Sequence, residues 1–269
     1  MRRLILLTAT ILVSLSLFAQ TSKNAADAFL DRFYAVKRFE EVAISPDGKR
    51  VAWIVAGEGA FAADARITTG KHDESGLAFS PDSKHLAFIS DKQLLVDGKP
   101  VTNVKGWLAE PKWSPDGKSI AFLLIENASR ASGPLVAMSR GVGVIDEDVA
   151  EQRIAILDLD TKKLRLVTPA DMYVYHFDWS PDGRKLAAVA APGNGDQNYW
   201  IAQLHLVDVS KATMKAIYKP KLQIADPKWS FSGKQIAFIE GLMSDEGSTG
   251  GDVMIVDADG KTRKTPRRT

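Results

Sequence analysis

A twelve-letter motif recurs five times along the chain and constrains its fold more than any other feature. Four copies read AISPDGKRVAWI from Ala43, AFSPDSKHLAFI from Ala78, KWSPDGKSIAFL from Lys112 and DWSPDGRKLAAV from Asp178. A fifth, degraded copy, KWSFSGKQIAFI, begins at Lys228. Successive copies are 35, 34, 66 and 50 residues apart, which is the scale of one supersecondary unit rather than of a whole domain.

Each copy predicts a tight turn followed by a buried strand. Pro presets φ at the first corner, Asp accepts hydrogen bonds from nearby backbone N–H groups, and Gly takes a positive φ at no steric cost. Ser83 replaces this Gly in the second copy, so we expect the least ideal turn there. The recurring tryptophans predict packing between units rather than a binding platform. The structural repeat residues are Pro46, Asp47, Pro81, Asp82, Trp113, Pro115, Asp116, Trp179, Pro181, Asp182 and Trp229.

A second motif, strand–turn–strand, follows the first in four of the five units. It occupies residues 93–104, 153–168, 203–218 and 252–266. Two successive hairpins form a four-stranded antiparallel sheet, and repetition of that sheet is typical of a β-propeller. The predicted fold is therefore all-β, with about five blades visible and the ring incomplete. The five units span residues 41–74, 75–106, 107–170, 171–222 and 223–266.

The remaining segments are assigned by composition. Residues 1–19 have Arg2 and Arg3 before an apolar run, which is the layout of a secretory signal peptide, and the run is short for a membrane span. Residues 20–40 hold a short helix candidate at 24–36, and the propeller follows over 41–266. An insertion at about 126–150 accounts for the longest repeat spacing, and 267–269 form a tail. We expect an exported protein, periplasmic or extracellular in a bacterium, and the chain has no cysteine.

Charge and side-chain patterns exclude several kinds of site. Without Arg2 and Arg3 the chain has 33 basic and 33 acidic residues, so no nucleic-acid partner is expected. The turn aspartates predict backbone hydrogen bonds rather than a ring of metal ligands. The histidines, which have no zinc-ligand spacing, are His72, His85, His176 and His205. We therefore expect no cofactor and no metal.

The repeats resemble those of TolB-type propellers. The opening AFLDRFYAVKRFEEVAISPDGKRVAWIVA (28–56) is similar to the propeller entry of prolyl oligopeptidase-family serine peptidases, the dipeptidyl and acylaminoacyl peptidases. Such peptidases carry a C-terminal α/β-hydrolase domain with a G-x-S-x-G elbow, and this chain contains no such motif. No catalytic residue of the family is carried over. The resemblance implies a propeller whose hydrolase domain is missing or separate, through truncation, a frameshift or a split gene.

The function expected from this resemblance is a non-catalytic propeller that filters or orients peptides for a hydrolase. Some dipeptidyl peptidases grip a substrate amine with paired propeller carboxylates. An acidic cluster in the insertion loosely resembles that arrangement, although a solvated charge run is the favoured interpretation. The cluster comprises Asp146, Glu147, Asp148 and Glu151. The first alternative is a free-standing TolB-like propeller that binds a protein partner. The second, a propeller hydrolase with a central metal, has no positive support in the sequence.

Overall fold

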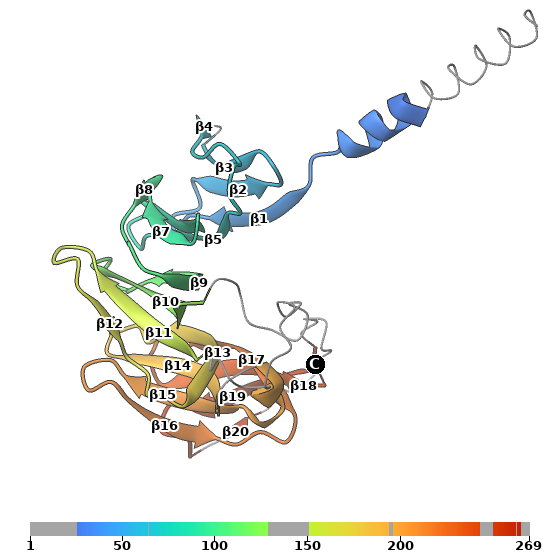
Figure 1. Ribbon diagram of the computed structural model, residues 1–269. Coiled ribbons are helices and arrows are strands. Elements are labelled where there is room, and N and C mark those ends of the chain that lie inside the picture. The colour runs from blue at the N-terminus through green and yellow to red at the C-terminus, as the bar shows by residue number, and fades with distance from the viewer. Residues whose placement is uncertain are drawn as a thin grey trace, which may run out of the picture. The chain divides into compact units, whose positions relative to one another are not determined.

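The computed structural model describes residues 26–63, 65–128, 151–193, 196–242, 250–261 and 263–264 (Figure 1). Contacts divide the chain into two compact units, residues 1–40 and 41–269. A helix over 26–34 belongs to the first unit and falls within the predicted range of 24–36. The predicted signal peptide lies outside the described residues. In the described part of the chain, no helix is both long enough and apolar enough to cross a membrane.

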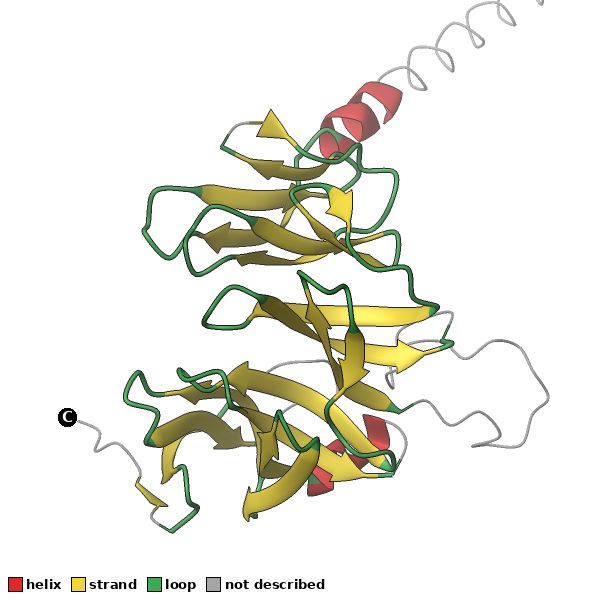
Figure 2. Cartoon of the chain, turned by 90° about the vertical axis from the view of Figure 1, so that its left-hand side faces the viewer, coloured by secondary structure: helices red, strands yellow, loops and turns green. Residues whose placement is uncertain are grey.

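Five four-stranded antiparallel sheets account for nearly all of the regular structure (Figure 2). Sheet 1 comprises β1 (Phe39–Ile44), β2 (Val51–Val55), β3 (Gly59–Ala62) and β4 (Ala65–Arg66). Sheet 2 comprises β5 (Ser75–Phe79), β6 (Leu86–Ser90), β7 (Gln93–Val96) and β8 (Lys99–Pro100). Sheet 3 comprises β9 (Gly106–Trp113), β10 (Ser119–Glu126), β11 (Gln152–Asp158) and β12 (Leu164–Leu166).

Sheet 4 comprises β13 (Met172–Trp179), β14 (Lys185–Pro192), β15 (Gln203–Asp208) and β16 (Thr213–Tyr218), with a 3₁₀ helix η1 (Asp196–Ile201) before β15. Sheet 5 comprises β17 (Gln223–Trp229), β18 (Gln235–Gly241), β19 (Asp252–Asp257) and β20 (Arg263–Lys264). Strand order within every sheet follows the chain. The all-β, propeller-type fold predicted from the repeats is confirmed.

The repeated turn joins the first and second strands of each sheet, and in sheets 1 to 4 a Ser–Asp pair makes the same hydrogen bonds. In sheet 3, the Ser114 hydroxyl donates to Asp116 Oδ1 at 2.6 Å, and the same carboxylate oxygen accepts from Lys118 N at 3.1 Å. Gly117 has a φ of +71°, which a residue with a Cβ rarely adopts. Ser83 adopts +63° in sheet 2, and its hydroxyl accepts a hydrogen bond from Asp47 N at 3.1 Å. The substitution of Gly by Ser therefore adds a contact between sheets 1 and 2.

An apolar cluster lies between each pair of consecutive sheets within residues 41–269. We call the side of a sheet that faces the preceding sheet its front face, and the side that faces the following sheet its back face. In sheet 3, Ile120 and Phe122 pack on the front face against sheet 2. The alternating residues Ala121 and Leu123 pack on the back face against sheet 4. A neighbouring sheet covers each face, and strand side chains alternate between the two faces. Residues on both faces of the second strand are therefore buried, which explains the continuous apolar runs.

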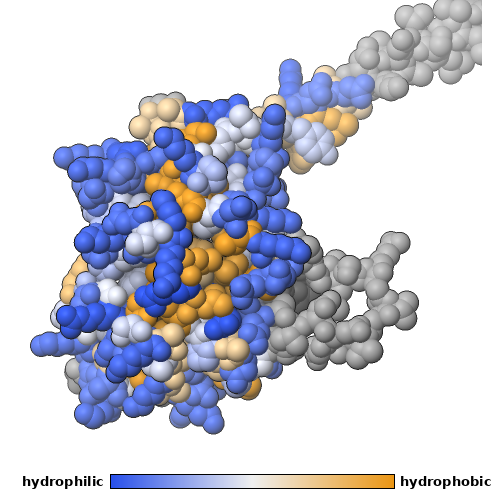
Figure 3. Space-filling model, turned by 60° about the vertical axis from the view of Figure 1, so that its left-hand side comes forward, coloured by the Kyte–Doolittle hydropathy of each residue, from blue (hydrophilic) through white to orange (hydrophobic). Residues whose placement is uncertain are grey.

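The surface has a different composition from these interfaces. On the face shown in Figure 3, most residues are hydrophilic and the apolar ones gather in a patch framed by them. Isolated apolar residues on a protein surface are ordinary, whereas a contiguous patch is informative.

Candidate functional site on the inner strands

Hydrogen bonds join the first strands of consecutive sheets, and these strands mark the inner side of the blades. The Glu41 carboxylate on β1 accepts hydrogen bonds from Gly76 N and Leu77 N on β5, each at 2.7 Å. The Trp229 N–H on β17 donates to the Asp178 carboxylate on β13 at 2.8 Å. Because the blades of a propeller surround a central channel, the edges at which neighbouring sheets approach most closely are the edges that line it.

Polar side chains recur at one position on these inner strands, three residues before the position of the repeat tryptophan. That position holds Glu41, Gly76, Glu110, His176 and Asp226 in sheets 1 to 5. Glu110 and Asp226 have positive φ angles of 48° and 50°, and strand pairing shifts register beside both. A β-bulge redirects a side chain and is often found next to functional sites. The backbone therefore departs from regular strand geometry at the charged residues Glu110 and Asp226.

Three of these residues form a row across sheets 3, 4 and 5. His176 Nδ1 lies 3.3 Å from Glu110 Oε1 and 3.7 Å from Asp226 Oδ1. Lys112 Nζ lies 3.3 Å from Glu110 Oε2 and 4.6 Å from the centre of the Phe177 ring. The side chains of Glu110, His176 and Asp226 are 33%, 27% and 51% exposed. The row is thus accessible to a ligand as well as internally paired.

The protonation of Glu110 reflects this pairing. Burial raises the pKa of Glu110, but hydrogen bonding to His176 and electrostatic interactions with Lys112 and His176 outweigh it, so the pKa lies below its usual value. Glu110 is therefore a carboxylate at neutral pH. A carboxylate in this position can accept hydrogen bonds from the N–H groups of a polar ligand and can attract a cation.

Aromatic side chains flank the row. The Tyr199 ring, on η1, lies 4.7 Å from the Tyr175 ring and 6.5 Å from the His176 ring. The Tyr199 hydroxyl donates to the Ile224 carbonyl at 2.8 Å, which ties η1 to β17. Rings beside charged and hydrogen-bonding groups form a surface suited to polar chains with apolar side chains. This combination makes the Glu110–His176–Asp226 row the candidate functional site.

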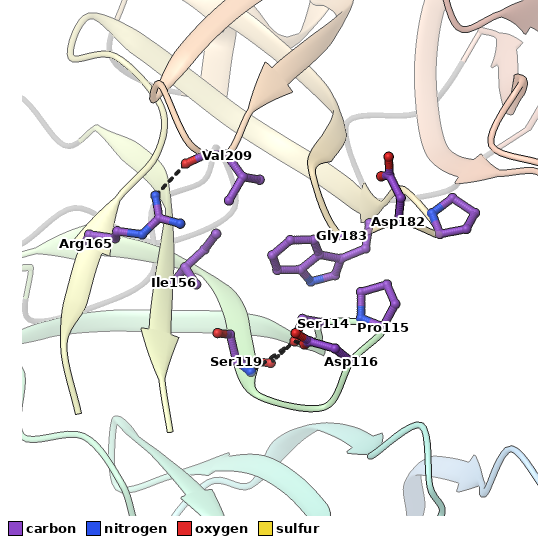
Figure 4. A pocket seen from close by; sticks show the side chains of 11 residues that line it. Ser114, Pro115, Asp116, Ser119, Ile156, Arg165, Asp182, Gly183 and Val209 are labelled. Carbon is purple, nitrogen blue, oxygen red and sulfur yellow. Dashed lines mark hydrogen bonds between the residues drawn. The ribbon is translucent and has the colours of Figure 1, made fainter. Parts of the chain in front are cut away.

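Crevices at the repeat turns are a second kind of hollow (Figure 4). One, of about 390 Å³, lies between sheets 3 and 4 and is lined by residues such as Pro115, Asp116, Asp182 and Val209. Another, of about 470 Å³, lies between sheets 2 and 3. Their aspartates form hydrogen bonds within their own turns, and the two crevices lie at equivalent positions between consecutive turns. We therefore regard them as a product of blade packing rather than as a specific site.

The repeat residues predicted from the sequence lie at the interfaces between sheets and in the turns. Trp113 and Trp179 are buried, and their indole N–H groups donate to Ala78 O at 2.9 Å and Lys112 O at 3.1 Å in the preceding sheet. Trp229 packs against the cluster between sheets 4 and 5. The turn aspartates that accept hydrogen bonds from the backbone N–H two residues on are Asp47, Asp82, Asp116 and Asp182.

The acidic cluster proposed for amine binding falls mostly outside the described residues. Asp146, Glu147 and Asp148 belong to that part, within the connection between β10 and β11. Glu151 is described, and its carboxylate accepts a hydrogen bond from Asp171 N at 3.0 Å. No group of acidic or histidine side chains among the described residues has an arrangement that could hold a metal ion.

Sequence reasoning did not select Glu110, His176 or Asp226, although a signal for them was present. Spacing along the chain does not single out His176, because its neighbours in space come from other repeats. Counting back three positions from the tryptophan position of the repeat, which holds Ile44 in sheet 1, places Glu41, Glu110, His176 and Asp226 in one register. In a repeat protein, residues at the same repeat position in neighbouring units are brought close together in space.

Comparison with known proteins places this fold among two groups of propellers. No model of a known protein family matches the chain. The peptidase YuxL of Bacillus subtilis (strain 168) is 27% identical over 201 residues, which cover 70% of this chain and 25% of YuxL. The chain thus spans a quarter of the length of the curated relative that it matches.

Solved structures show the same fold at low identity. A TolB protein from Agrobacterium tumefaciens matches with a TM-score of 0.57 and 20% identity, covering 85% of this chain and 80% of that one. Dipeptidyl peptidase 4 from Porphyromonas gingivalis matches with a TM-score of 0.56 and 13% identity, covering 87% of this chain and 40% of that one. The predicted resemblance to TolB-type and peptidase propellers is confirmed.

Proposed function

We propose that this chain is a non-catalytic propeller module that binds and positions peptides for an exported serine peptidase of the prolyl oligopeptidase type. The observation that carries the proposal is the Glu110–His176–Asp226 row on the inner strands of three sheets. A propeller that serves only as a scaffold does not require accessible charged side chains at β-bulges on its inner strands. The match to the peptidase YuxL over most of the chain supports the same function.

The chemistry of the row suits an extended peptide. Glu110 and Asp226 offer carboxylate oxygens to backbone N–H groups or to an amino group, and His176 and Lys112 offer N–H donors to carbonyl oxygens. Tyr175 and Tyr199 provide apolar area beside these groups. A channel with both donors and acceptors binds a peptide loosely and leaves bond cleavage to a hydrolase domain, separate or missing.

The test is peptide binding by the purified chain, measured by fluorescence anisotropy of short labelled peptides with a free amino terminus. Removing both negative charges, as Glu110→Gln with Asp226→Asn, should weaken binding by about tenfold, because charge-assisted hydrogen bonds are the stronger kind. The control is Asp160→Asn, which removes a charge from an exposed turn of sheet 3. Equal binding by the double variant and the control would refute the proposed role of the row.

A TolB-like propeller that binds a folded protein partner is the second candidate. The likeness that favours it extends over 80% of the Agrobacterium TolB chain, more than for the peptidase structure. Under this alternative, short peptides do not bind and the inner-strand variants have no effect. Both candidates include export, which N-terminal sequencing of the product secreted from bacteria would test, since cleavage is expected near residue 19.

A further inference from the structure

A third hollow, of about 420 Å³, lies between sheets 3 and 4, each of which packs against a described sheet on both sides. With the turn crevice between the same two sheets it shares Arg165, Gly183 and Val209. Asp182 lines the turn crevice but not this hollow. The remaining residues of the hollow are Arg184, Lys185, Asp208 and Ser210. Its lining therefore includes three basic residues and one acidic residue, and we call it the basic hollow.

The excess of positive charge belongs to this interface and not to the repeat as a whole. Strand register and turn position define the equivalent residues at the two flanking interfaces. Between sheets 4 and 5, the charged residues at these positions are Lys215, Lys234, Asp257 and Asp259. Between sheets 2 and 3, they are Lys99, Lys118, Asp158 and Asp160. Basic and acidic residues balance at both flanking interfaces, whereas the basic hollow has two more basic residues than acidic ones.

The single carboxylate of the basic hollow is bonded within its own turn. Asp208 Oδ1 accepts hydrogen bonds from the Ser210 hydroxyl at 2.7 Å and from the backbone N–H groups of Ser210 and Lys211, each at 3.0 Å. Asp208 Oδ2 lies 3.8 Å from Lys211 Nζ. The carboxylate thus pairs with Lys211 and not with the three basic side chains of the hollow.

The basic side chains offer hydrogen-bond donors that the protein does not use. Arg165 Nη1 donates to the Val209 carbonyl at 2.5 Å, which fixes the guanidinium between sheets 3 and 4 (Figure 4). In the part of the chain that the structure describes, its other N–H groups have no partner, and the side chains of Arg184 and Lys185 have none either. A guanidinium presents its N–H donors in a planar fork that matches two oxygens of a phosphate or a carboxylate.

We propose that the basic hollow binds a phosphate group. The two excess positive charges match a phosphate, which carries up to two negative charges near neutral pH, better than a single carboxylate, which carries one. The hollow is larger than a phosphate needs, and Val209 and the aliphatic stems of the basic residues can contact the organic part of a phosphate ester. The proposal does not rest on the proposed function, because it uses neither the inner-strand row nor peptide binding.

Isothermal titration calorimetry of the purified chain with inorganic phosphate and with phenyl phosphate, at constant ionic strength, tests the proposal. The wild type should bind both probes. Tighter binding of phenyl phosphate would show that the site takes a phosphate ester, and equal binding would show that it takes phosphate itself. The double variant Arg165→Gln with Arg184→Gln should raise both dissociation constants by about tenfold or more, because it removes two charged donors.

The matched control is the double variant Lys215→Gln with Lys234→Gln. It changes the equivalent positions between sheets 4 and 5 and has the same net charge as the test variant, so it should bind both probes like the wild type. Folding is checked beforehand by circular dichroism and a cooperative melt. Arg184→Gln alone keeps the hydrogen bond from Arg165 to Val209, and it replaces the double variant if the latter does not fold.

Three results would overturn the proposal. One is a wild-type chain that binds neither probe. Another is equal weakening by the test and control variants, which would indicate attraction by the overall charge of the protein rather than by the basic hollow. The third is binding of succinate as tight as that of both phosphate probes, which would indicate a site for carboxylates in general.

Discussion

The indole N–H groups of the repeat tryptophans should make their stability contributions unequal. Trp113 and Trp179 donate to carbonyl oxygens of the preceding sheet, at 2.9 and 3.1 Å. The buried Trp229 Nε1 has no hydrogen-bond partner among the described residues. Replacement of each tryptophan by phenylalanine keeps an aromatic ring in the interface and removes the N–H. The three substitutions therefore differ mainly in whether a hydrogen bond or an unpaired donor is lost.

The expected magnitudes follow from this difference. Trp179→Phe loses one net hydrogen bond, about 1 kcal/mol, and part of the packed ring, so we expect a total cost of about 2 kcal/mol. Trp113→Phe should cost the same. Trp229→Phe loses similar packing but removes an unpaired buried donor, whose burial costs about 1–3 kcal/mol, so we expect a net change near zero. Alanine at any of the three positions should cost about 3–5 kcal/mol, because it empties the aromatic site.

Urea denaturation followed by far-ultraviolet circular dichroism measures these free energies of unfolding. The phenylalanine series is informative only if all variants keep the wild-type dependence on urea concentration, which reports the surface exposed on unfolding. A Trp229→Phe variant that loses as much stability as Trp179→Phe would refute the argument from the unpaired donor. Alanine variants that each lose less than about 1 kcal/mol would refute the packing role of the tryptophans altogether.

Two further predictions concern activity and pH. The chain should not hydrolyse aminoacyl-nitroanilide substrates, because it lacks the G-x-S-x-G elbow; turnover that a serine-directed phosphonate blocks would contradict this. Burial lowers the pKa of His205, partly offset by a hydrogen bond with the Gln203 carbonyl, so the unfolded chain binds the proton first as pH falls below about 6.5. The free energy of unfolding should therefore fall as the pH falls below about 6.5, and His205→Gln should reduce this loss; an identical pH dependence in the variant would exclude His205 as its source.

The fold was predictable from the sequence because most blades repeat similar turn and strand patterns. The Ser-Pro-Asp-Gly turn, the apolar second strand and the Asp-centred hairpin each predict structure from a few neighbouring residues. The sheets accordingly begin close to the predicted unit starts, with β9 at Gly106, β13 at Met172 and β17 at Gln223. In such a chain, local preference and the overall fold agree in every unit.

The candidate site was less accessible to sequence reasoning because it depends on register between blades. Glu110 and Asp226 are 116 positions apart in the chain, yet both lie near His176, and the strand pairing shifts register beside each of them. The turn aspartates attracted attention by their repetition, although repetition itself indicated a structural role. The exposure of Ile44 and Val51 was equally unpredictable from the sequence, because both residues fit the repeat pattern.

The indole bond that links sheets 2 and 3 is reproduced between sheets 3 and 4, from Trp113 to Ala78 and from Trp179 to Lys112. A contact that recurs between consecutive blades does not specify how many blades the propeller has. Blade number in such an assembly is therefore a property of the gene, which duplication or deletion of one unit can change while every surviving contact is kept. Duplication and deletion of single blades would produce propellers of different sizes, and known propellers range from four to eight blades.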